Sequence, residues 1–169
     1  MVQRENQSGL IVRVVIQRVR RGAIAIGGNT TAEIGQGFVI LLGVCQGDRA
    51  ESARFLAEKC AHLRIFEDSA GKMNLALQDV HGSVLVVSQF TLYADAQKGN
   101  RPGFSLAARP DEAEPLYDAF VERMRELLGS ERVQTGVFHA MMEVTIVNDG
   151  PVTILIEHPG ATSTKEKPG

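Results

Sequence analysis

The stretch that decides the fold of this chain is Ser83-Val84-Leu85-Val86-Val87-Ser88-Gln89-Phe90-Thr91. Its apolar run is rich in β-branched residues, which predicts a strand buried on both faces. The run stops at Ser88, and polar groups follow as far as Thr91. Small polar side chains at the end of a buried strand are held rigidly and still reach solvent, which is typical of a functional site. The alternative is that Ser88 and Thr91 only satisfy local backbone groups.

The residues before this stretch predict more strands. Residues 11–19 are rich in β-branched side chains and read as a strand. Residues 23–26 and 31–34 flank Gly27-Gly28-Asn29 and predict a hairpin. Residues 38–44 are entirely apolar, so we expect this strand in the centre of a sheet.

Two amphipathic helices are predicted. Asp48 is placed to cap a helix over residues 50–63, whose apolar face carries Phe55, Leu56, Cys60 and Leu63. The second helix starts at Pro110 and is ended by Gly129. Its apolar face carries Leu116, Phe120, Met124 and Leu127 or Leu128.

The last third of the chain returns to strands, at residues 133–135, 142–147 and 152–157. The two long ones are joined by Asn148-Asp149-Gly150-Pro151, which has the composition of a tight hairpin turn. The order of elements predicts a mixed sheet with both helices packed on one side.

Size and composition indicate one globular α/β domain. The chain has 169 residues, of which 44% are hydrophobic and 22% charged. Residues 1–10 read as an N-terminal extension, residues 11–158 as the domain and residues 159–169 as a disordered tail. No apolar run approaches the roughly 20 residues of a membrane span, and the start lacks a signal-peptide core. Cys45 and Cys60 are interpreted as reduced, structural thiols of a cytoplasmic protein.

Charge and motif content exclude several function classes. The formal net charge of −2 argues against a protein that coats nucleic acid non-specifically. It does not exclude a nucleic-acid substrate that is held by a local basic patch. Lys98 and Arg101 lie in a glycine-rich loop over residues 96–103 that is suited to phosphate contacts. The four histidines show no metal-ligand spacing, and no P-loop, dinucleotide fingerprint or serine elbow is present.

Two motifs together resemble a known family. Ser88-Gln89-Phe90-Thr91 followed by Asn148-Asp149-Gly150-Pro151-Val152-Thr153 is similar to the signature pair of the bacterial D-aminoacyl-tRNA deacylases, first described as D-tyrosyl-tRNA deacylases. The resemblance extends from residue 11 to residue 157. It includes Ile16-Gln17-Arg18-Val19, Gly71-Lys72-Met73-Asn74, Arg101-Pro102-Gly103-Phe104 and Gln134-Thr135-Gly136-Val137-Phe138.

The resemblance implies a homodimeric, cofactor-free hydrolase. Its substrate would be the ester between a D-amino acid and the 3′-terminal adenosine of tRNA, with glycyl-tRNA as a secondary substrate. The fold implied is a three-layer α/β/β arrangement with a mixed, barrel-like sheet and two main helices. The alternatives are a non-catalytic dimeric RNA-binding module of the same fold, or a hydrolase of small D-amino-acid esters or amides.

The resemblance places catalysis at Ser88, Gln89, Phe90 and Thr91. Thr91 matches the family threonine proposed as nucleophile, and a competing view gives that role to the 2′-hydroxyl of the tRNA. A threonine hydroxyl is a poor nucleophile without an activating base, and the sequence offers no obvious histidine or lysine nearby. Backbone N–H groups near Phe90 and Thr91 would instead stabilise a tetrahedral oxyanion. Chemistry therefore favours assistance by the RNA.

Substrate binding is carried over to Gly150, Pro151, Arg18, Phe138 and Met142. Gly150-Pro151 matches the family's cis-proline selectivity filter, which reaches into the site of the partner subunit. Carbonyls that crowd one side of Cα would clash with an L side chain, whereas a D side chain or a glycine hydrogen fits, so selectivity would come from exclusion. Arg18 matches an arginine that hydrogen-bonds the carbonyls of this motif. The alternatives are an ordinary turn at Gly150-Pro151 and a solvated cation at Arg18.

Overall fold

The computed structural model of this chain describes residues 11–159. The extension predicted at residues 1–10 lies outside the described residues, and so does the tail predicted at residues 159–169 except for Pro159. The elements in chain order are β1 (Ile11–Ile26), β2 (Asn29–Ile34), β3 (Gly37–Gly43), α1 (Ala50–His62), β4 (Phe66–Glu67), β5 (Met73–Leu75), β6 (Ser83–Ser88), the 3₁₀ turn η1 (Phe90–Tyr93), α2 (Pro110–Leu128), the 3₁₀ turn η2 (Ser130–Arg132), β7 (Val133–Thr135) and β8 (Glu143–Pro159).

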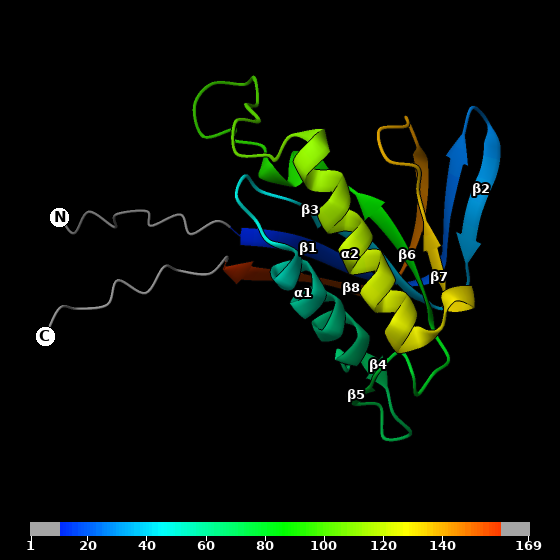
Figure 1. Cartoon of the computed structure of the whole chain (residues 1–169). Coiled ribbons are helices and arrows are strands. Elements are labelled where there is room, and N and C mark those ends of the chain that lie inside the picture. Colours follow the sequence, from blue (N-terminus) through cyan, green and yellow to red (C-terminus); the bar gives the residue numbers. More distant parts are fainter. Residues whose placement is uncertain (1–10, 160–169) are drawn as a thin grey trace, which may run out of the picture.

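One mixed sheet organises the domain, with strand order β2-β1-β3-β6-β7 and with β8 also paired to β1. The β3–β6 and β6–β7 pairs are parallel, whereas β1 pairs antiparallel with β2, β3 and β8. Both helices cover the same face of this sheet, as Figure 1 shows. The predicted mixed sheet, the buried strand at β6 and the one-sided helices are confirmed.

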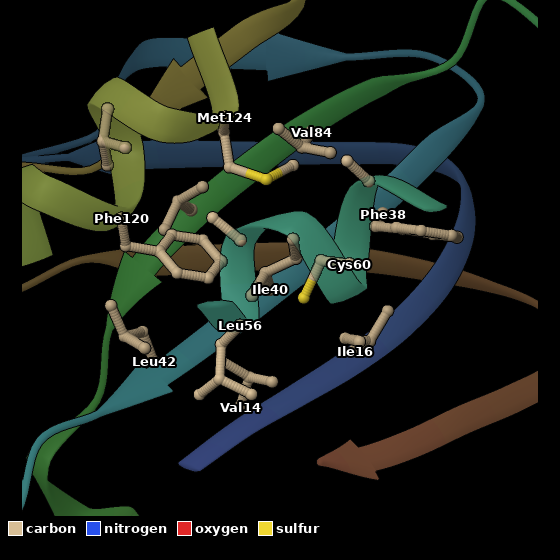
Figure 2. Packing of buried hydrophobic residues seen from close by; sticks show 14 of the residues in the cluster. Val14, Ile16, Phe38, Ile40, Leu42, Leu56, Cys60, Val84, Phe120 and Met124 are labelled. Atoms are coloured by element: carbon tan, nitrogen blue, oxygen red, sulfur yellow. The ribbon is translucent and has the colours of Figure 1, made fainter. Parts of the chain in front are cut away.

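The strands β3 and β6 are buried on both faces, because alternate side chains enter two separate cores. Ile40 and Val86 belong to the larger core beneath the helices, which also contains Leu56 of α1 and Phe120 of α2. Figure 2 shows Ile40, Leu56 and Phe120 in this core. Val39 and Leu85, one residue earlier on each strand, belong to a smaller core on the opposite face. This explains why the sequence of both strands is a continuous apolar run.

The second half of β1 helps to cover the smaller core, together with β2 and partly buried residues of the first half of β8. The backbone of β1 lies close to β3 at Gly22, where a Cβ atom would lie 2.7 Å from Cγ2 of Val39. A larger residue there would push the two layers apart. Helices, sheet and covering strands form the predicted three-layer α/β/β domain with a barrel-like sheet.

The predicted hairpin at Asn148–Pro151 is wrong. Residues 143–159 form the single strand β8, and both of its halves pair with the single long strand β1, from Ile11↔Pro159 to Ala25↔Glu143. The two halves therefore do not pair with each other, and the tetrapeptide interrupts the β1–β8 ladder instead of reversing the chain. The same correction joins the separately predicted strands 11–19 and 23–26 into β1.

Asp48 does not cap α1. Arg49 occupies the N-cap position without a side-chain hydrogen bond, and Oδ2 of Asp48 accepts a 2.6 Å bond from the N–H of Cys45. The apolar face of α1 also differs from the prediction at Phe55, which is 42% exposed and packs on the ring of His158 at 4.2 Å between centroids. Leu56 and Cys60 are buried as predicted.

Replacing Asp48 by Asn should stabilise the protein at neutral and alkaline pH. Burial raises the pKa of Asp48 to about 6, above its ordinary value of 3.8, because Oδ1 is buried without a partner. The folded state therefore holds this proton more tightly, and stability falls as the pH rises from about 4 to about 6. Asn keeps the acceptor for Cys45 and removes the charge. Discounted for partial exposure, the gain is about 1 kcal/mol at pH 8.

Thermal unfolding of the Asp48→Asn variant measures this gain, which corresponds to about 2–4 °C in Tm. The matched control is Asp79→Asn, because Oδ2 of Asp79 accepts from the N–H of Ala76 at 2.8 Å in the same three-residue arrangement on an exposed surface. The control should show no comparable gain. An Asp48→Asn gain that is equal at pH 4 and pH 8 would contradict the explanation by charge burial.

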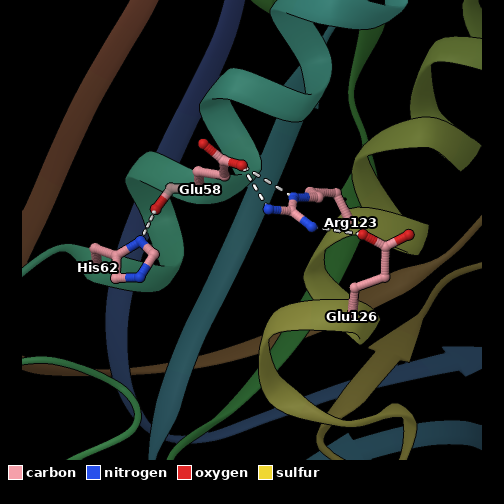
Figure 3. Close-up of polar contacts among 4 residues, drawn as sticks. All are labelled: Glu58, His62, Arg123 and Glu126. Atoms are coloured by element: carbon pink, nitrogen blue, oxygen red, sulfur yellow. Dashed lines mark hydrogen bonds and ion pairs between the residues drawn. The ribbon is translucent and has the colours of Figure 1, made fainter.

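Ion pairs join the two helices on their solvent side. Arg123 of α2 donates to Oε1 of Glu58 of α1 through Nη2 at 2.6 Å, and to Oε2 of Glu126 through Nη1 at 2.6 Å. Figure 3 shows this bridge, together with the ring of His62 against the backbone carbonyl of Glu58. These side chains are exposed or half-exposed, so the bridge orients the helices more than it stabilises them.

Within residues 11–159 neither helix is both long and apolar enough to cross a membrane. Cys45 and Cys60 are both buried and form no disulfide with each other. Burial raises the pKa of the Cys60 thiol, which makes it unreactive.

Candidate active site

A cavity of about 570 Å³ lies at the end of β6. Ser88, Gln89 and Phe90 form one part of its wall, and Phe138 and Met142 form another. The structure therefore brings together five of the nine residues predicted for the site, although they are separated by about fifty positions in sequence. The parallel strands β3 and β6 end on this side of the sheet, where α/β folds commonly place ligands.

The end of β6 is held firmly in place. The N–H of Gln89 donates to the carbonyl of Leu42 on β3 at 2.8 Å, and the N–H of Leu92 donates back to the carbonyl of Gln89 at 3.3 Å. Phe90 and Thr91 then open the η1 turn. The first N–H groups of a helical turn have no acceptor within that turn, which leaves those of Phe90 and Thr91 suited to an anionic oxygen.

Thr91 is exposed and does not belong to the cavity wall. Its Oγ1 accepts a hydrogen bond from Nε2 of Gln89. An amide N–H is a donor and cannot take the threonine proton, so this contact orients the hydroxyl without activating it.

His139 corrects the expectation that no histidine lies near the site. It belongs to the wall of the cavity, and its ring stands edge-on to Phe138 with centroids 4.6 Å apart. Within residues 11–159 no hydrogen bond joins His139 to Ser88, Gln89 or Thr91. The imidazole is thus present in the cavity without being coupled to the predicted nucleophile.

The wall around Phe138 and Met142 is built on α2 and on the end of β7. The hydroxyl of Tyr117 donates to the carbonyl of Val86 at 2.8 Å, and its ring lies 5.9 Å from that of Phe138. Gly136 allows Met142 to pack closely, because a Cβ atom there would lie 2.7 Å from its sulfur. Contacts with Tyr117 and Gly136 therefore position Phe138 and Met142, the two predicted binding residues.

Sequence reasoning missed the segment that closes the cavity near the start of α2. Phe104, Ala107, Ala108 and Ala113 line this side, and the ring of Phe104 meets that of Phe90 edge-on at 5.2 Å. Phe104 belongs to the Arg101–Phe104 segment that carried the family resemblance, so the sequence could have marked it as a candidate site residue. Small alanines show no pattern that would mark them as lining residues.

Arg18, Gly150 and Pro151 form a second group. Arg18 is only 5% exposed and donates through Nε to the carbonyl of Asp149 at 3.0 Å and through Nη1 to the carbonyl of Ile65 at 2.7 Å. It is thus no solvated cation. The Gly150–Pro151 peptide bond is cis, as expected, and both residues are exposed.

The two groups do not meet within one chain. Ser88 pairs with Leu42, whereas Arg18 pairs with Phe38, whose partner on β6 is Val84. Four residues of strand correspond to about 13 Å along β6. Neither Arg18, Gly150 nor Pro151 lines the cavity.

Among residues 11–159 no group of three or more His, Cys, Asp or Glu side chains is arranged to hold a metal ion. The described residues that line the cavity include no carboxylate, lysine or arginine. Its polar groups are the side chains of Ser88, Gln89 and His139 and the backbone. This arrangement is suited to orienting a neutral or weakly charged ligand and to stabilising an oxyanion.

Comparison with known proteins gives one consistent result. The family described as D-Tyr-tRNA(Tyr) deacylase matches residues 15–157. A D-aminoacyl-tRNA deacylase of Symbiobacterium thermophilum is 55% identical over 148 residues, covering 88% of this chain and 97% of the relative. A D-aminoacyl-tRNA deacylase of Thermus aquaticus is 52% identical over 158 residues, covering 94% and 99%.

Solved structures agree in fold. The c-Myc DNA unwinding element binding protein superposes with a TM-score of 0.83 at 40% identity, covering 88% of this chain and 99% of that one. A probable eukaryotic D-amino acid tRNA deacylase reaches a TM-score of 0.75 at 20% identity, over 88% and 100%, which shows the shared fold. By sequence along nearly its whole described length, the chain belongs to the D-Tyr-tRNA(Tyr) deacylase family.

Proposed function

We propose that this protein hydrolyses the ester bond of D-aminoacyl-tRNA and of mischarged glycyl-tRNA, releasing the free amino acid and tRNA, and that it rejects L-aminoacyl-tRNA. The observation that carries the proposal is the cavity in which Ser88, Gln89 and Phe90 face Phe138 and Met142. Relatives more than half identical to this chain are named D-aminoacyl-tRNA deacylases. We place its action in the cytoplasm, where charged tRNA is used.

The cavity would receive the terminal adenosine and its ester. Phe90, which is 56% exposed, and Phe138 offer apolar surface to the base and ribose. The N–H groups that open η1 would stabilise the oxyanion formed at the ester carbon. The neighbouring 2′-hydroxyl of the ribose would attack the ester carbon, which moves the aminoacyl group to the 2′-oxygen and releases the 3′-hydroxyl. Water would then hydrolyse the 2′ ester to the free amino acid and the 2′-hydroxyl.

A second copy of the chain would complete the site. The exposed Gly150 and Pro151 lie apart from the cavity of their own chain, so a two-fold dimer would bring them to the cavity of the partner. There their carbonyls would crowd one side of the substrate Cα. An L side chain would clash, whereas a D side chain or hydrogen would fit.

The test of function is hydrolysis of D-tyrosyl-tRNA and L-tyrosyl-tRNA at equal enzyme concentration. We expect release of D-tyrosine and little or no release of L-tyrosine. The two substrates differ only in the side of Cα that carries the side chain, and the proposed carbonyls would block the side that an L side chain occupies. Glycyl-tRNA should also be hydrolysed. Equal rates for the two enantiomers, or no release of either, would overturn the proposal.

The test of assembly is light scattering at micromolar concentration. We expect a mass of about twice the 18.3 kDa of the chain. A monomer that retains full activity and chiral selectivity would contradict a site shared between subunits.

Two other functions remain to be separated. The 40%-identical structural neighbour is named a DNA-binding protein, and a non-catalytic nucleic-acid module would bind charged tRNA without turnover. A hydrolase of small esters would act on a D-amino-acid methyl ester as well as on charged tRNA. The exposed Lys98 and Arg101, in a loop closed by the Asp95–Gly103 backbone pair, favour an RNA substrate.

A further inference from the structure

We propose that Asn148 is a positioning residue that holds Gly150 and Pro151 in the orientation needed to discriminate D from L substrates. The inference rests on the proposed function, and it adds a residue on the opposite side of the motif from Arg18. Its basis is the way in which β8 leaves the β1 ladder and returns to it.

Three residues are extruded from β8 at this point. Gln17 of β1 pairs with Thr153 of β8, and Val19 pairs with Asn148. Between these pairs β1 advances two residues whereas β8 advances five. The four residues from Asp149 to Val152 therefore stand opposite Arg18 alone, and none of them has a partner in the β1 ladder to hold its shape.

The side chain of Asn148 closes the base of this excursion. Its Oδ1 accepts from the N–H of Val152 at 2.9 Å, which spans the extruded residues. Its Nδ2 donates to Oγ1 of Thr153 at 3.3 Å, and Nε2 of Gln17 donates to the same oxygen at 3.4 Å. The side-chain amide of Asn148, the last paired residue before the extruded segment, is thus hydrogen-bonded to Val152 and Thr153 at its end.

The opposite side is held by arginines. Arg18 donates to the carbonyl of Asp149, and Nε of Arg20 lies 3.3 Å from Oδ1 of the same residue. A Cβ atom at Gly150 would lie 3.3 Å from Nη2 of Arg18 and 2.8 Å from Cγ2 of Val152, so Gly150 sits between the two supports. The arginines fix the residue before Gly150, and Asn148 fixes the residue after Pro151.

Removing the side-chain amide of Asn148 would leave the hydrogen bond from Arg18 to Asp149 in place. The backbone that follows Pro151 would lose its hydrogen bond to Asn148. The N–H of Val152 is part-buried and would have no acceptor from the side chain, so the backbone would turn to satisfy it. Gly150 and Pro151 are exposed, and their own packing would not restore the original orientation. A shift of the Gly150 and Pro151 carbonyls would then open the side from which they are proposed to exclude an L side chain.

The experiment compares Asn148→Ala, Asn148→Asp and Arg123→Ala with the wild-type protein. The Asp variant keeps an acceptor for the N–H of Val152 and can accept from the hydroxyl of Thr153, so it is the rescue variant. Arg123→Ala removes ion pairs between the helices, on residues outside the motif, and controls for the loss of polar contacts elsewhere in the protein. Each protein is assayed for kcat and KM on D- and L-tyrosyl-tRNA, and amide hydrogen exchange is measured at Val152.

In Asn148→Ala the ratio of D to L hydrolysis should fall roughly 10- to 100-fold, the usual cost of misplacing a group by about 1 Å. Exchange at Val152 should accelerate in the folded protein. Asn148→Asp should restore most of the ratio, and Arg123→Ala should leave it unchanged. An unchanged ratio in Asn148→Ala, or an equal fall in Arg123→Ala, would overturn the inference. Absence of D-specific hydrolysis in the wild-type protein would instead refute the proposed function.

Discussion

A D-aminoacyl-tRNA that ends in 2′-deoxyadenosine should be hydrolysed at least about 100-fold more slowly than the same tRNA ending in adenosine, which is the scale of removing one group that acts in the transition state. The reason is that no contact among residues 11–159 activates the hydroxyl of Thr91 as a nucleophile. The hydroxyl of Thr91 is exposed and receives a hydrogen bond from the amide of Gln89. Because an amide donor cannot accept a proton, we propose that the 2′-hydroxyl of the tRNA acts in place of Thr91.

The companion variant is Thr91→Ala, which should retain activity within about tenfold on the ribose substrate, well short of the loss of a catalytic group. Thr91→Ser is the conservative control. His139→Ala tests the imidazole that lines the cavity as an alternative base. Single-turnover rates on the adenosine-ended and the 2′-deoxyadenosine-ended tRNA distinguish catalysis by Thr91, by His139 and by the 2′-hydroxyl. Normal turnover of the deoxy substrate would refute assistance by the RNA, and a loss of about 1,000-fold in Thr91→Ala would make the threonine the nucleophile.

Replacing Arg18 by Met should lower the free energy of unfolding by about 3 kcal/mol, which is the scale of leaving one buried and one part-buried carbonyl oxygen without a donor. The guanidinium is buried and supplies donors to the carbonyls of Ile65 and Asp149. Met fills similar volume without donors, so both carbonyls would lose a partner. The support before Gly150 would be lost with them, and the preference for D substrates should weaken.

Denaturant unfolding at neutral pH measures the first effect, and the ratio of D to L hydrolysis below the transition measures the second. Arg21→Met is the matched control, because Arg21 lies on the same strand and pairs with Glu33 on an exposed surface. The control should change neither quantity appreciably. Equal unfolding midpoints for Arg18→Met and Arg21→Met would show that buried Arg18 contributes no more to stability than exposed Arg21.

The sequence by itself determined the parts of this protein that depend on local pattern. The β-branched apolar run at residues 83–88 specifies β6, because only a strand with both faces covered tolerates such a run. The spacing of Phe120 and Met124, with Gly129 after the last turn, specifies α2 and its end. The same pattern marked the strand end at Ser88 as a candidate site, and the family resemblance then assigned Ser88, Gln89 and Phe90 to it.

Only the tertiary structure decided what depends on partners far along the chain. Asn148-Asp149-Gly150-Pro151 has the composition of a turn, and that composition is the same whether the chain reverses or merely bulges. The outcome was set by β1, which is long enough to pair with both halves of β8. Long-range pairing also placed His139 in the cavity and kept Gly150 and Pro151 away from it. Register between distant strands leaves no local trace in the sequence, because a side chain's face depends on which residue stands opposite it.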